Sequence, residues 1–427
     1  MNVGGADIER KIFSRGGFNL KRKKVVLLIS VVCLALIVAV TPFVGGCAKE
    51  APAPTPTPTP TPTPAPTPTP TPVAPAEETW ELVGESAWSA GMTKMNAMHI
   101  HHIDLIDKFT NGRVKLELHY APELVGAMEI LGTVKDGGLD FGIGCPCYAK
   151  GMCYGCSLFC DAPGGQSPRE ELMWFYLGGG KDLLEELWTG STGTFPLASC
   201  QNTSEVWLYG NKIINTIDDL KGLKMRAAGT RCDILNYIGG AAVTMAGGEI
   251  VPNLEKGVID ACEFASQYCT QEIGLTQVTK YCYYHPYKST SSFWLFSINM
   301  DVWDEFPDDI KAAIADATKV NHLWSLSQGY IWEMETLKIA AEEDGAQFVY
   351  LPPAVIEEFD KGGRDFLRDK AKEDASVAAV LDSWDAFKAD YGPYAKWIDV
   401  SDMTNWLGLW EDDVSSWYEP VVWPEPK

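Results

Sequence analysis

A proline-threonine repeat divides this chain into parts that fold by different rules. Residues 51–76 are mostly alternating proline and threonine. Proline fixes φ and lacks an amide hydrogen, so the repeat adopts an extended polyproline conformation and buries no core. At about 3.1 Å per residue, it can hold a domain several tens of ångströms from an anchor. We therefore expect a tether over residues 48–78, with a leader before it and the folded part after it.

The first 47 residues have the pattern of an export signal. Four basic residues, 21–24, precede an apolar run from Val25 to about Val44. Positive charges stay in the cytoplasm while the apolar run enters the bilayer. Two glycines then precede Cys47, which resembles a bacterial lipoprotein signal and implies that Cys47 is lipidated and becomes the mature N-terminus. An uncleaved membrane helix is the alternative, since about 20 apolar residues can span a bilayer. Both place the rest of the chain outside the cytoplasm.

The exported part is strongly acidic. The first 47 residues hold seven of the 35 basic and two of the 57 acidic side chains, which leaves 28 basic against 55 acidic. This imbalance argues against nucleic acid and against an anionic membrane surface as partners. An anionic ligand would need a specific local cation, because the overall field repels it.

From about Thr79 onward, strand and helix patterns alternate over roughly 350 residues, enough for two domains. A strand is predicted over 80–87, an amphipathic helix over 92–109 and a strand over 113–119. Further strands are predicted over 139–143, 223–226, 242–245, 258–263 and 293–299, and helices over 128–134, 231–238 and 249–255. This order is typical of an α/β fold with mostly parallel sheets. We expect two lobes within residues 79–397.

The C-terminal third is predicted to be helical. Pro307 opens a helical pattern with little to stop it before Asp344, which predicts about 35 residues, or roughly 55 Å, enough to span two lobes. Helix is also expected up to Trp397. The tail, residues 398–427, carries four tryptophans and is expected to pack on the domain or to form a dimer contact. Two tethered lobes outside the cell suggest a receptor that closes around a small molecule.

One segment narrows the function further. Residues 218–263 read DDLKGLKMRAAGTRCDILNYIGGAAVTMAGGEIVPNLEKGVIDACE. They resemble the solute-binding receptors of tripartite ATP-independent periplasmic (TRAP) transporters, the DctP-like family. The matching pieces are Asp219–Arg226, a helix ending in Gly239-Gly240, Glu249 opening a helix, Gly257–Asp260 and, in the first lobe, Asn111–Val114 and Gly137–Asp140. The resemblance extends in order over about residues 85–390.

This resemblance implies a periplasmic-binding-protein-like fold and a receptor role without catalysis. The implied ligand is a small organic acid, captured for import and delivered to the TRAP membrane subunits. Two other functions stay open: a metal- or cluster-bearing exported redox lipoprotein, and a sensor module of the same fold.

Arg226 is the main candidate for a ligand contact. It ends a short apolar strand, the place where open α/β sheets bind ligands. A guanidinium there can hold a carboxylate by two parallel hydrogen bonds, which lysine cannot reproduce. In the family, the arginine of this motif holds the substrate carboxylate, and the resemblance carries that role to Arg226. The alternative is a surface arginine paired with an acid such as Asp219.

Glu263 is the second candidate. IDACEFAS looks most like the family branch that binds 2-oxo acids, which has an acid followed by tryptophan there. In that branch the acid helps to hold a cation that bridges to the ligand. Here Phe264 follows Glu263, and YCYYHPYKST has residues 288–290 where that branch places a second acid. The resemblance therefore implies that Glu263 and Phe264 line the pocket, with Glu263 as the candidate metal ligand; otherwise no cofactor is expected.

Three further residues are candidates for the pocket. The resemblance places two of them, Tyr148 and Asn202, in loops that face the cleft in the family; the third, Trp88, follows the first strand. Tyr148 comes just after the predicted strand 139–143, and Asn202 lies in CQNTS. Trp88 follows the first strand and is expected to wall the pocket, with ordinary core packing as the alternative.

The stretch CPCYAKGMCYGCSLFC, Cys145 to Cys160, holds five cysteines. It lacks the full spacing of a bacterial ferredoxin. Disulfides are plausible in an exported domain, although Cys145 and Cys147 are too close to pair with each other without strain. Disulfides, packed thiols and a metal site all stay open here.

Three histidines near the start of the domain also suggest a metal site. His99 and His102 share a helix face at this spacing, whereas His101 does not join them. We expect a solvated helix face. The sequence contains neither G-x-S-x-G nor H-E-x-x-H, the motifs of common hydrolytic sites.

Overall fold

The computed structural model describes residues 78–160, 167–285 and 291–407, and only the backbone of residues 392–407. The leader with Cys47, the tether up to residue 77 and the end of the tail lie outside these residues. Among the helices that are described, none is long and apolar enough to cross a membrane. The predicted leader and tether therefore stay predictions.

The first sheet has five strands and is mixed rather than purely parallel. In spatial order, its strands are β2 (Val114–Tyr120), β1 (Trp80–Ser86), β3 (Phe141–Gly144), β10 (Phe293–Asn299) and β4 (Thr194–Gln201). The three strands nearest the N-terminus are parallel, as predicted. Strand β10 is antiparallel to both β3 and β4. The return strand predicted over 293–299 therefore lies between β3 and β4.

The second sheet has six shorter strands. In spatial order they are β11 (Gln347–Tyr350), β9 (Tyr281–Tyr284), β5 (Leu208–Gly210), β8 (Ala261–Cys262), β6 (Lys224–Arg226) and β7 (Ala241–Val243). Strand β6 lies parallel between β7 and β8, with Arg226 level with Cys262. This register brings the end of the arginine strand beside the residues that follow β8.

Helices cover both sheets. The α-helices are α2 (Thr93–Phe109), α3 (Ile130–Lys135), α4 (Tyr154–Ser157), α5 (Pro168–Leu177), α6 (Gly180–Thr192), α7 (Gly229–Tyr237), α8 (Ile250–Glu255), α9 (Gln267–Glu272), α10 (Leu275–Val278), α11 (Met300–Glu305), α12 (Asp308–Glu342), α13 (Pro353–Ala371) and α14 (Ala375–Leu407). The described residues also form three short 3₁₀ helices, η1 (Pro146–Ala149), η2 (Ile217–Leu220) and η3 (Gly247–Glu249). With two sheets, flanking helices and a long helix between them, the predicted two-lobe α/β fold is confirmed.

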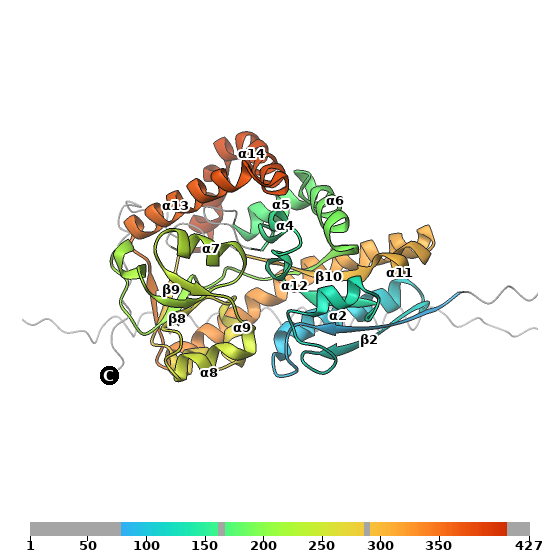
Figure 1. Cartoon of the computed structure of the whole chain (residues 1–427), viewed down its shortest axis with the longest axis horizontal. Helices are drawn as coiled ribbons and strands as arrows, with labels where there is room; N and C mark the ends of the chain where they lie inside the picture. The colour runs from blue at the N-terminus through green and yellow to red at the C-terminus, as the bar shows by residue number, and fades with distance from the viewer. Residues whose placement is uncertain (1–77, 161–166, 286–290, 408–427) are drawn as a thin grey trace, which may run out of the picture. The chain divides into compact units, whose positions relative to one another are not determined.

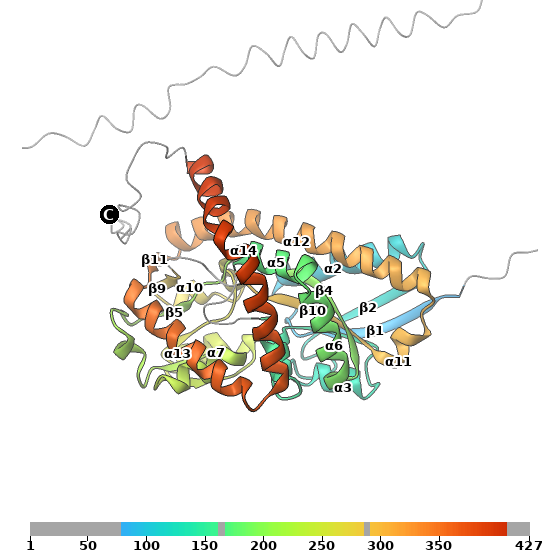
Figure 2. The same cartoon turned by 90° about the horizontal axis from the view of Figure 1, so that it is seen from above.

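Helix α12 connects the two halves. It is 35 residues long, as predicted from Pro307 and Asp344. It contacts α2 and β4 beside the first sheet and α9 beside the second, and Figures 1 and 2 show it running past both. The chain also passes between the sheets from β4 to β5 and from β9 to β10. These crossings place the segments after β4 and before β10 at the junction of the lobes.

The C-terminal helices pack back over the junction. Helix α13 contacts α7 of the second lobe, and α14 contacts α4 and α6 of the first; Figure 1 shows both in red. Helix α14 continues past residue 397 to Leu407. The tryptophan-rich tail beyond it lies outside the described residues, and its proposed packing or dimer contact stays a prediction.

The expectation of a solvated histidine face is wrong. His99 and His102 do share a face of α2, but both are fully buried because α12 and β4 cover it. Trp88 Nε1 donates to His99 Nε2, and His102 contacts Thr318 and Ser199. Burial, reinforced by the neighbouring histidine, lowers the pKa of each of the two rings to about 3. They are structural groups in a hydrogen-bonded core.

Glu333 of α12 makes the stability of the folded protein depend on pH. Its carboxylate accepts hydrogen bonds from the backbone N–H groups of Gln267 and Tyr268, in the first turn of α9. Burial raises its pKa to about 7, although these two hydrogen bonds oppose that shift. Below about pH 4.5 both folded and unfolded chains hold the proton, and between pH 4.5 and 7 the folded chain alone retains it. The stabilisation from this group is therefore lost as pH rises through 7.

We expect Glu333→Gln to remove this dependence. The free energy of unfolding of the original chain should fall relative to the variant by up to about 3 kcal/mol between pH 5 and pH 8. Urea denaturation of both proteins at a series of pH values measures the difference. A difference that stays constant with pH would contradict the assignment.

Candidate functional site

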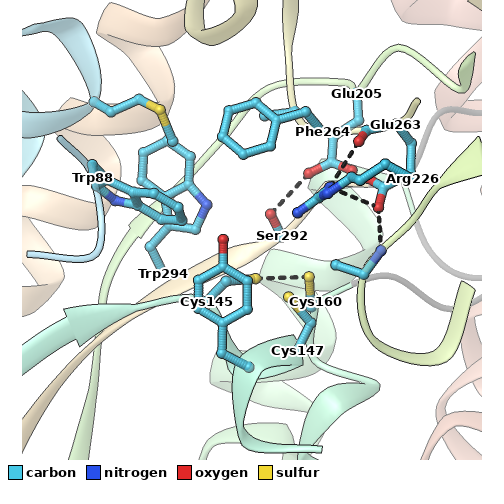
Figure 3. A pocket seen from close by; sticks show the side chains of 14 residues that line it. Trp88, Cys145, Cys147, Cys160, Glu205, Arg226, Glu263, Phe264, Ser292 and Trp294 are labelled. Atoms are coloured by element: carbon cyan, nitrogen blue, oxygen red, sulfur yellow. Dashed lines mark hydrogen bonds and ion pairs between the residues drawn. The ribbon is translucent and has the colours of Figure 1, made fainter. Parts of the chain in front are cut away.

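A pocket lies where segments of both lobes meet, and it contains the predicted arginine (Figure 3). From the first lobe and β10 it is lined by Trp88, Met95, Cys145, Cys147, Tyr148, Cys160, Ser292 and Trp294. From the second lobe it is lined by Glu205, Arg226, Ala228, Glu263, Phe264 and Ala265. The space in it that a water-sized molecule can occupy is about 20 Å³, room for about one water molecule. A larger guest requires these walls to separate.

Arg226 ends β6 and is buried, with 1% of its surface exposed. Its Nη1 donates to the carboxylate of Glu263 at 3.0 Å and to the carbonyl oxygen of the same residue at 2.7 Å, and its Nε donates to the Met245 carbonyl. Within the described residues, its Nη2 takes part in no hydrogen bond. The predicted alternative, a surface arginine paired with Asp219, is not what the structure has; Asp219 caps η2 instead.

Glu263 forms a buried ion pair with Arg226, at 3.0 Å between Nη1 and Oε1. The pairing follows from the sheet register, since Glu263 comes directly after Cys262, the partner of Arg226. Glu263 Oε1 also accepts from the backbone N–H of Ala228. Burial opposes the charge of Arg226, but the Glu263 carboxylate raises the pKa of the guanidinium above its ordinary value. The pocket therefore holds a fixed positive group that is paired with Glu263, one of its two lining acids; the other is Glu205.

Four aromatic side chains, Trp88, Tyr148, Phe264 and Trp294, form part of the remaining wall. The Phe264 ring centroid lies 5.3 Å from the Arg226 guanidinium carbon, and its ring meets that of Trp88 edge-on. Trp88 also contacts Tyr148 and Trp294. A charged group inside such a wall is shielded from water, which strengthens its interaction with an anion. The predicted Trp88, Tyr148 and Phe264 thus all border the pocket.

Two glycines allow backbone to approach this wall closely. Gly229 opens α7 with φ of +54°, and a Cβ there would lie 2.7 Å from the Cβ of Cys147. A Cβ on Gly247 would lie 2.6 Å from the Phe264 ring. A side chain at either position would push the pocket wall aside.

Asn202 lies next to the pocket rather than in its lining. It is fully buried after β4; its Nδ2 donates to Glu205 at 2.7 Å, and its Oδ1 accepts from the backbone N–H of Ser292 at 2.7 Å. The Ser292 hydroxyl also donates to Glu205. Asn202 thereby ties together two lining residues from separate crossings between the lobes. Its predicted ligand contact stays a prediction.

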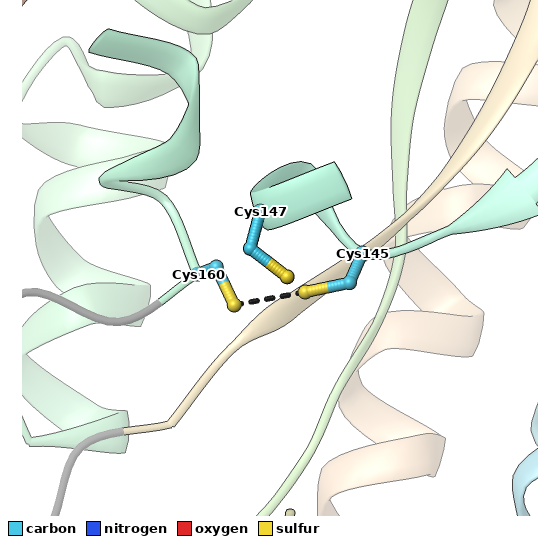
Figure 4. Close-up of side chains that lie close together, drawn as sticks. All are labelled: Cys145, Cys147 and Cys160. Carbon is cyan, nitrogen blue, oxygen red and sulfur yellow. Dashed lines mark hydrogen bonds between the residues drawn. The ribbon is translucent and has the colours of Figure 1, made fainter. Parts of the chain in front are cut away.

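The cysteine-rich stretch divides into two groups. Cys153 and Cys156 form a disulfide around the start of α4. Cys145, Cys147 and Cys160 lie together at the pocket, and the Cys145 and Cys160 sulfurs are 2.8 Å apart (Figure 4). Burial alone would raise the pKa of the Cys147 thiol, but hydrogen bonds from the other two thiols and the Arg226 charge lower it to about 6. Sequence reasoning left the state of these cysteines open and did not place them in the site.

Other lining residues that sequence reasoning missed have no local signal. Glu205 and Ser292 lie in loops that contain no recognisable motif. Trp294 lies in a strand in which every residue is buried, so its burial does not distinguish it from its neighbours. They reach the pocket because β4, β10 and the lobe crossings bring them there. Only a knowledge of the strand pairing could have identified them.

A larger hollow of about 240 Å³ lies elsewhere, beside α6 and α12. Its walls are mainly apolar, with three lysines, Lys181, Lys311 and Lys319, and none of its lining residues is an arginine. Two of these lysines, Lys181 and Lys319, form ion pairs with acids on their own helices. We therefore place the candidate site at the buried arginine.

Comparison with known proteins agrees on one family. The profile of bacterial extracellular solute-binding proteins, family 7 (DctP), matches residues 84–374. A monocarboxylate 2-oxoacid-binding periplasmic protein of Nostoc sp. strain PCC 7120 is 26% identical over 285 residues, which cover 66% of this chain and 77% of that protein.

Solved structures with the same fold include solute-binding proteins of TRAP transporters. A TRAP periplasmic solute-binding protein of Pseudoalteromonas atlantica T6c, with bound sodium and pyruvate, has a TM-score of 0.72 at 22% identity, over 78% of this chain and all of that one. A TRAP transporter solute-binding protein of Bordetella bronchiseptica RB50, with calcium and picolinate, has a TM-score of 0.74 at 19% identity, over 78% of this chain and 99% of that one. At these identities the likeness shows the fold.

Proposed function

Because the chain belongs to the bacterial extracellular solute-binding proteins, family 7, we propose that it is a TRAP receptor whose ligand is a small monocarboxylate of the 2-oxo acid class. The observation that carries the proposal is the Arg226 guanidinium, buried in a pocket that both lobes line. Its Nη2 is the group we assign to the ligand carboxylate, since Nε and Nη1 already hold protein oxygens. The 2-oxoacid-binding relative and the pyruvate-bound structure support this ligand class.

The proposed mechanism is capture by lobe closure. Because the pocket has room for about one water molecule, the ligand enters when the lobes part and the aromatic side chains separate. On closing, Arg226 pairs with the carboxylate while Trp88, Tyr148 and Phe264 exclude water. The closed form then docks on the membrane subunits, which receive the acid. This role is binding and release, without catalysis.

Sodium or calcium, which accompany the ligand in structures of relatives, fit the residues of this pocket poorly. Calcium takes six to eight oxygen ligands. Of the pocket-lining residues only Glu205 and Glu263 are carboxylates, and the Glu205 Oε1 already accepts two hydrogen bonds. Among the described residues, the one group of three or more His, Cys, Asp and Glu side chains that could converge on an ion consists of cysteines. Glu263 as a ligand of a bridging cation stays a prediction.

The proposal also includes a membrane anchor at the N-terminal end and a dimer contact at the C-terminal end of the sequence. We propose that lipidated Cys47 and the proline-threonine tether hold the receptor at the outer face of the cell membrane. The tail, residues 398–427, is the segment that we propose for a dimer contact. Mass spectrometry of the mature N-terminus would detect the lipid on Cys47 or an uncleaved leader.

Identification of the acid tests the proposed function. The protein should be purified gently and any bound small molecule identified by mass spectrometry. Isothermal titration calorimetry should then compare pyruvate, larger 2-oxo acids, 2-hydroxy acids and matched amides. We expect micromolar or tighter binding of at least one acid and no binding of its amide, which lacks the charge that Arg226 requires. Equal binding of acid and amide would refute the proposal.

A further inference from the structure

Three thiols from separate segments converge on one side of the pocket. Cys145 follows β3, Cys147 lies in η1, and Cys160 follows α4. Their sulfur atoms all lie within 4.8 Å of one another, and each residue is 8% exposed. Figure 4 shows the three side chains directed at a common point.

The local fold keeps these three thiols together and apart from the other cysteines of the stretch. Cys153 and Cys156 are joined to each other by a disulfide. The Cys145 and Cys160 sulfurs, at 2.8 Å, are in hydrogen-bond contact and well beyond the S–S bond length of about 2.05 Å. Gly229 lets the start of α7 press against Cys147. The close approach of Gly229 therefore helps to hold Cys147 in place.

We infer that Cys145, Cys147 and Cys160 form a three-thiolate site for a soft divalent metal ion of the zinc class, in the wall of the ligand pocket. Thiolates select soft ions over sodium, calcium and magnesium. With metal–sulfur bonds of about 2.3 Å in a tetrahedron, the sulfurs should lie about 3.8 Å apart. The present spacing therefore needs Cys145 and Cys160 to separate by about 1 Å, a shift that side-chain rotation can supply. Three thiols bind one ion and release three protons to solvent.

The fourth coordination position would face the pocket. Three protein ligands leave a tetrahedral ion one open position, and all three cysteines line the same pocket as Arg226. Three thiolates with a divalent ion carry one net negative charge; the Arg226 guanidinium in the same pocket is already paired with Glu263 and does not neutralise it. This part of the inference rests on the proposed function: the ligand carboxylate lies on Arg226 while a neighbouring oxygen or sulfur of the ligand completes the coordination of the metal.

Cobalt titration tests the site without any organic acid. The full chain, reduced and kept free of oxygen, should be titrated with Co²⁺ while thiolate-to-cobalt absorption is recorded. We expect one equivalent to bind and Zn²⁺ to displace it. Cys147→Ser and Cys160→Ser should each weaken binding by more than the roughly 100-fold that loss of an outer-shell partner costs. Cys232→Ser, a buried cysteine of α7 outside the pocket, should bind as the original chain does.

Absence of the thiolate band, or an unchanged band in Cys147→Ser, would overturn the inference. Circular dichroism confirms that each variant is folded. Arg226→Met separates the two proposals, because it should lose the organic acid and keep the cobalt band. Zinc loading should tighten binding of the acid at least tenfold in the original chain and leave Cys147→Ser unaffected. Metal binding with no change in acid affinity would refute the open fourth position.

Discussion

Arg226→Met is expected to lose nearly all affinity for the organic acid. The variant buries a carboxylate opposite an apolar side chain, and truncating one partner of a buried charge pair costs about 2–5 kcal/mol or more. That loss corresponds to a weakening of roughly 30- to 5,000-fold. Arg226→Lys should bind with intermediate affinity, since lysine keeps the charge but loses the planar guanidinium, which holds Met245 and Glu263 through Nε and Nη1 while Nη2 is left for the ligand. Calorimetry with the acid identified from the purified protein measures both.

A second buried arginine offers a matched control. Arg231 lies in α7, is 3% exposed and donates to the Trp207 carbonyl without lining the pocket. Arg231→Met should reduce stability but leave the affinity for the acid within about twofold. Because Arg226→Met also removes the partner of Glu263, its folding must be verified by circular dichroism. A folded Arg226→Met that binds the acid as tightly as the original chain would eliminate Arg226 as the carboxylate contact.

The elements with strong local signals could be predicted from the sequence. Helix α12 has Pro307 before its first residue and Asp344-Gly345 just after its last. Strand β10 is a run of seven residues that are all buried, and two serines precede it. Both were predicted within a residue or two, because caps and apolar runs act over short distances.

Strand pairing and burial depend on residues far apart in the chain. Strand β4 was not predicted, and its antiparallel pairing with β10 joins segments about 100 residues apart. The histidine face of α2 looked polar enough for solvent, but α12, more than 200 residues later, covers it. No periodicity within α2 carries that information.

In the site, too, some residues could be identified from local sequence, whereas their contacts depend on strand pairing. Arg226 and Glu263 stand at strand ends inside a recognisable segment, so they could be identified as candidates. Their ion pair needed the register of β6 against β8. The spacing of the cysteines favoured no single state, because the disulfide and the three-thiol group interleave along the chain. Their separation became evident only when β3, η1 and α4 were placed in space.

Glu263→Gln is expected to destabilise the protein without its ligand by about 3–5 kcal/mol, the cost of breaking a buried ion pair by removing one charge. In the original chain, the Arg226 side chain is 1% exposed and the Glu263 side chain is 6% exposed. The variant leaves the guanidinium buried opposite a neutral amide. A ligand carboxylate can then replace the missing charge. Saturating acid should therefore raise the melting temperature of the variant more than that of the original chain.

Asp316→Asn is the control for charge removal on its own. Asp316 pairs with Lys319 on the exposed face of α12, where the side chains are 65% and 55% exposed, and such pairs contribute about 0–1 kcal/mol. Differential scanning calorimetry of all three proteins, with and without the acid, measures the effects. If Glu263→Gln were as stable as Asp316→Asn, or gained no more from the acid than the original chain does, Glu263 would not be the resident counter-charge that the ligand must share with Arg226.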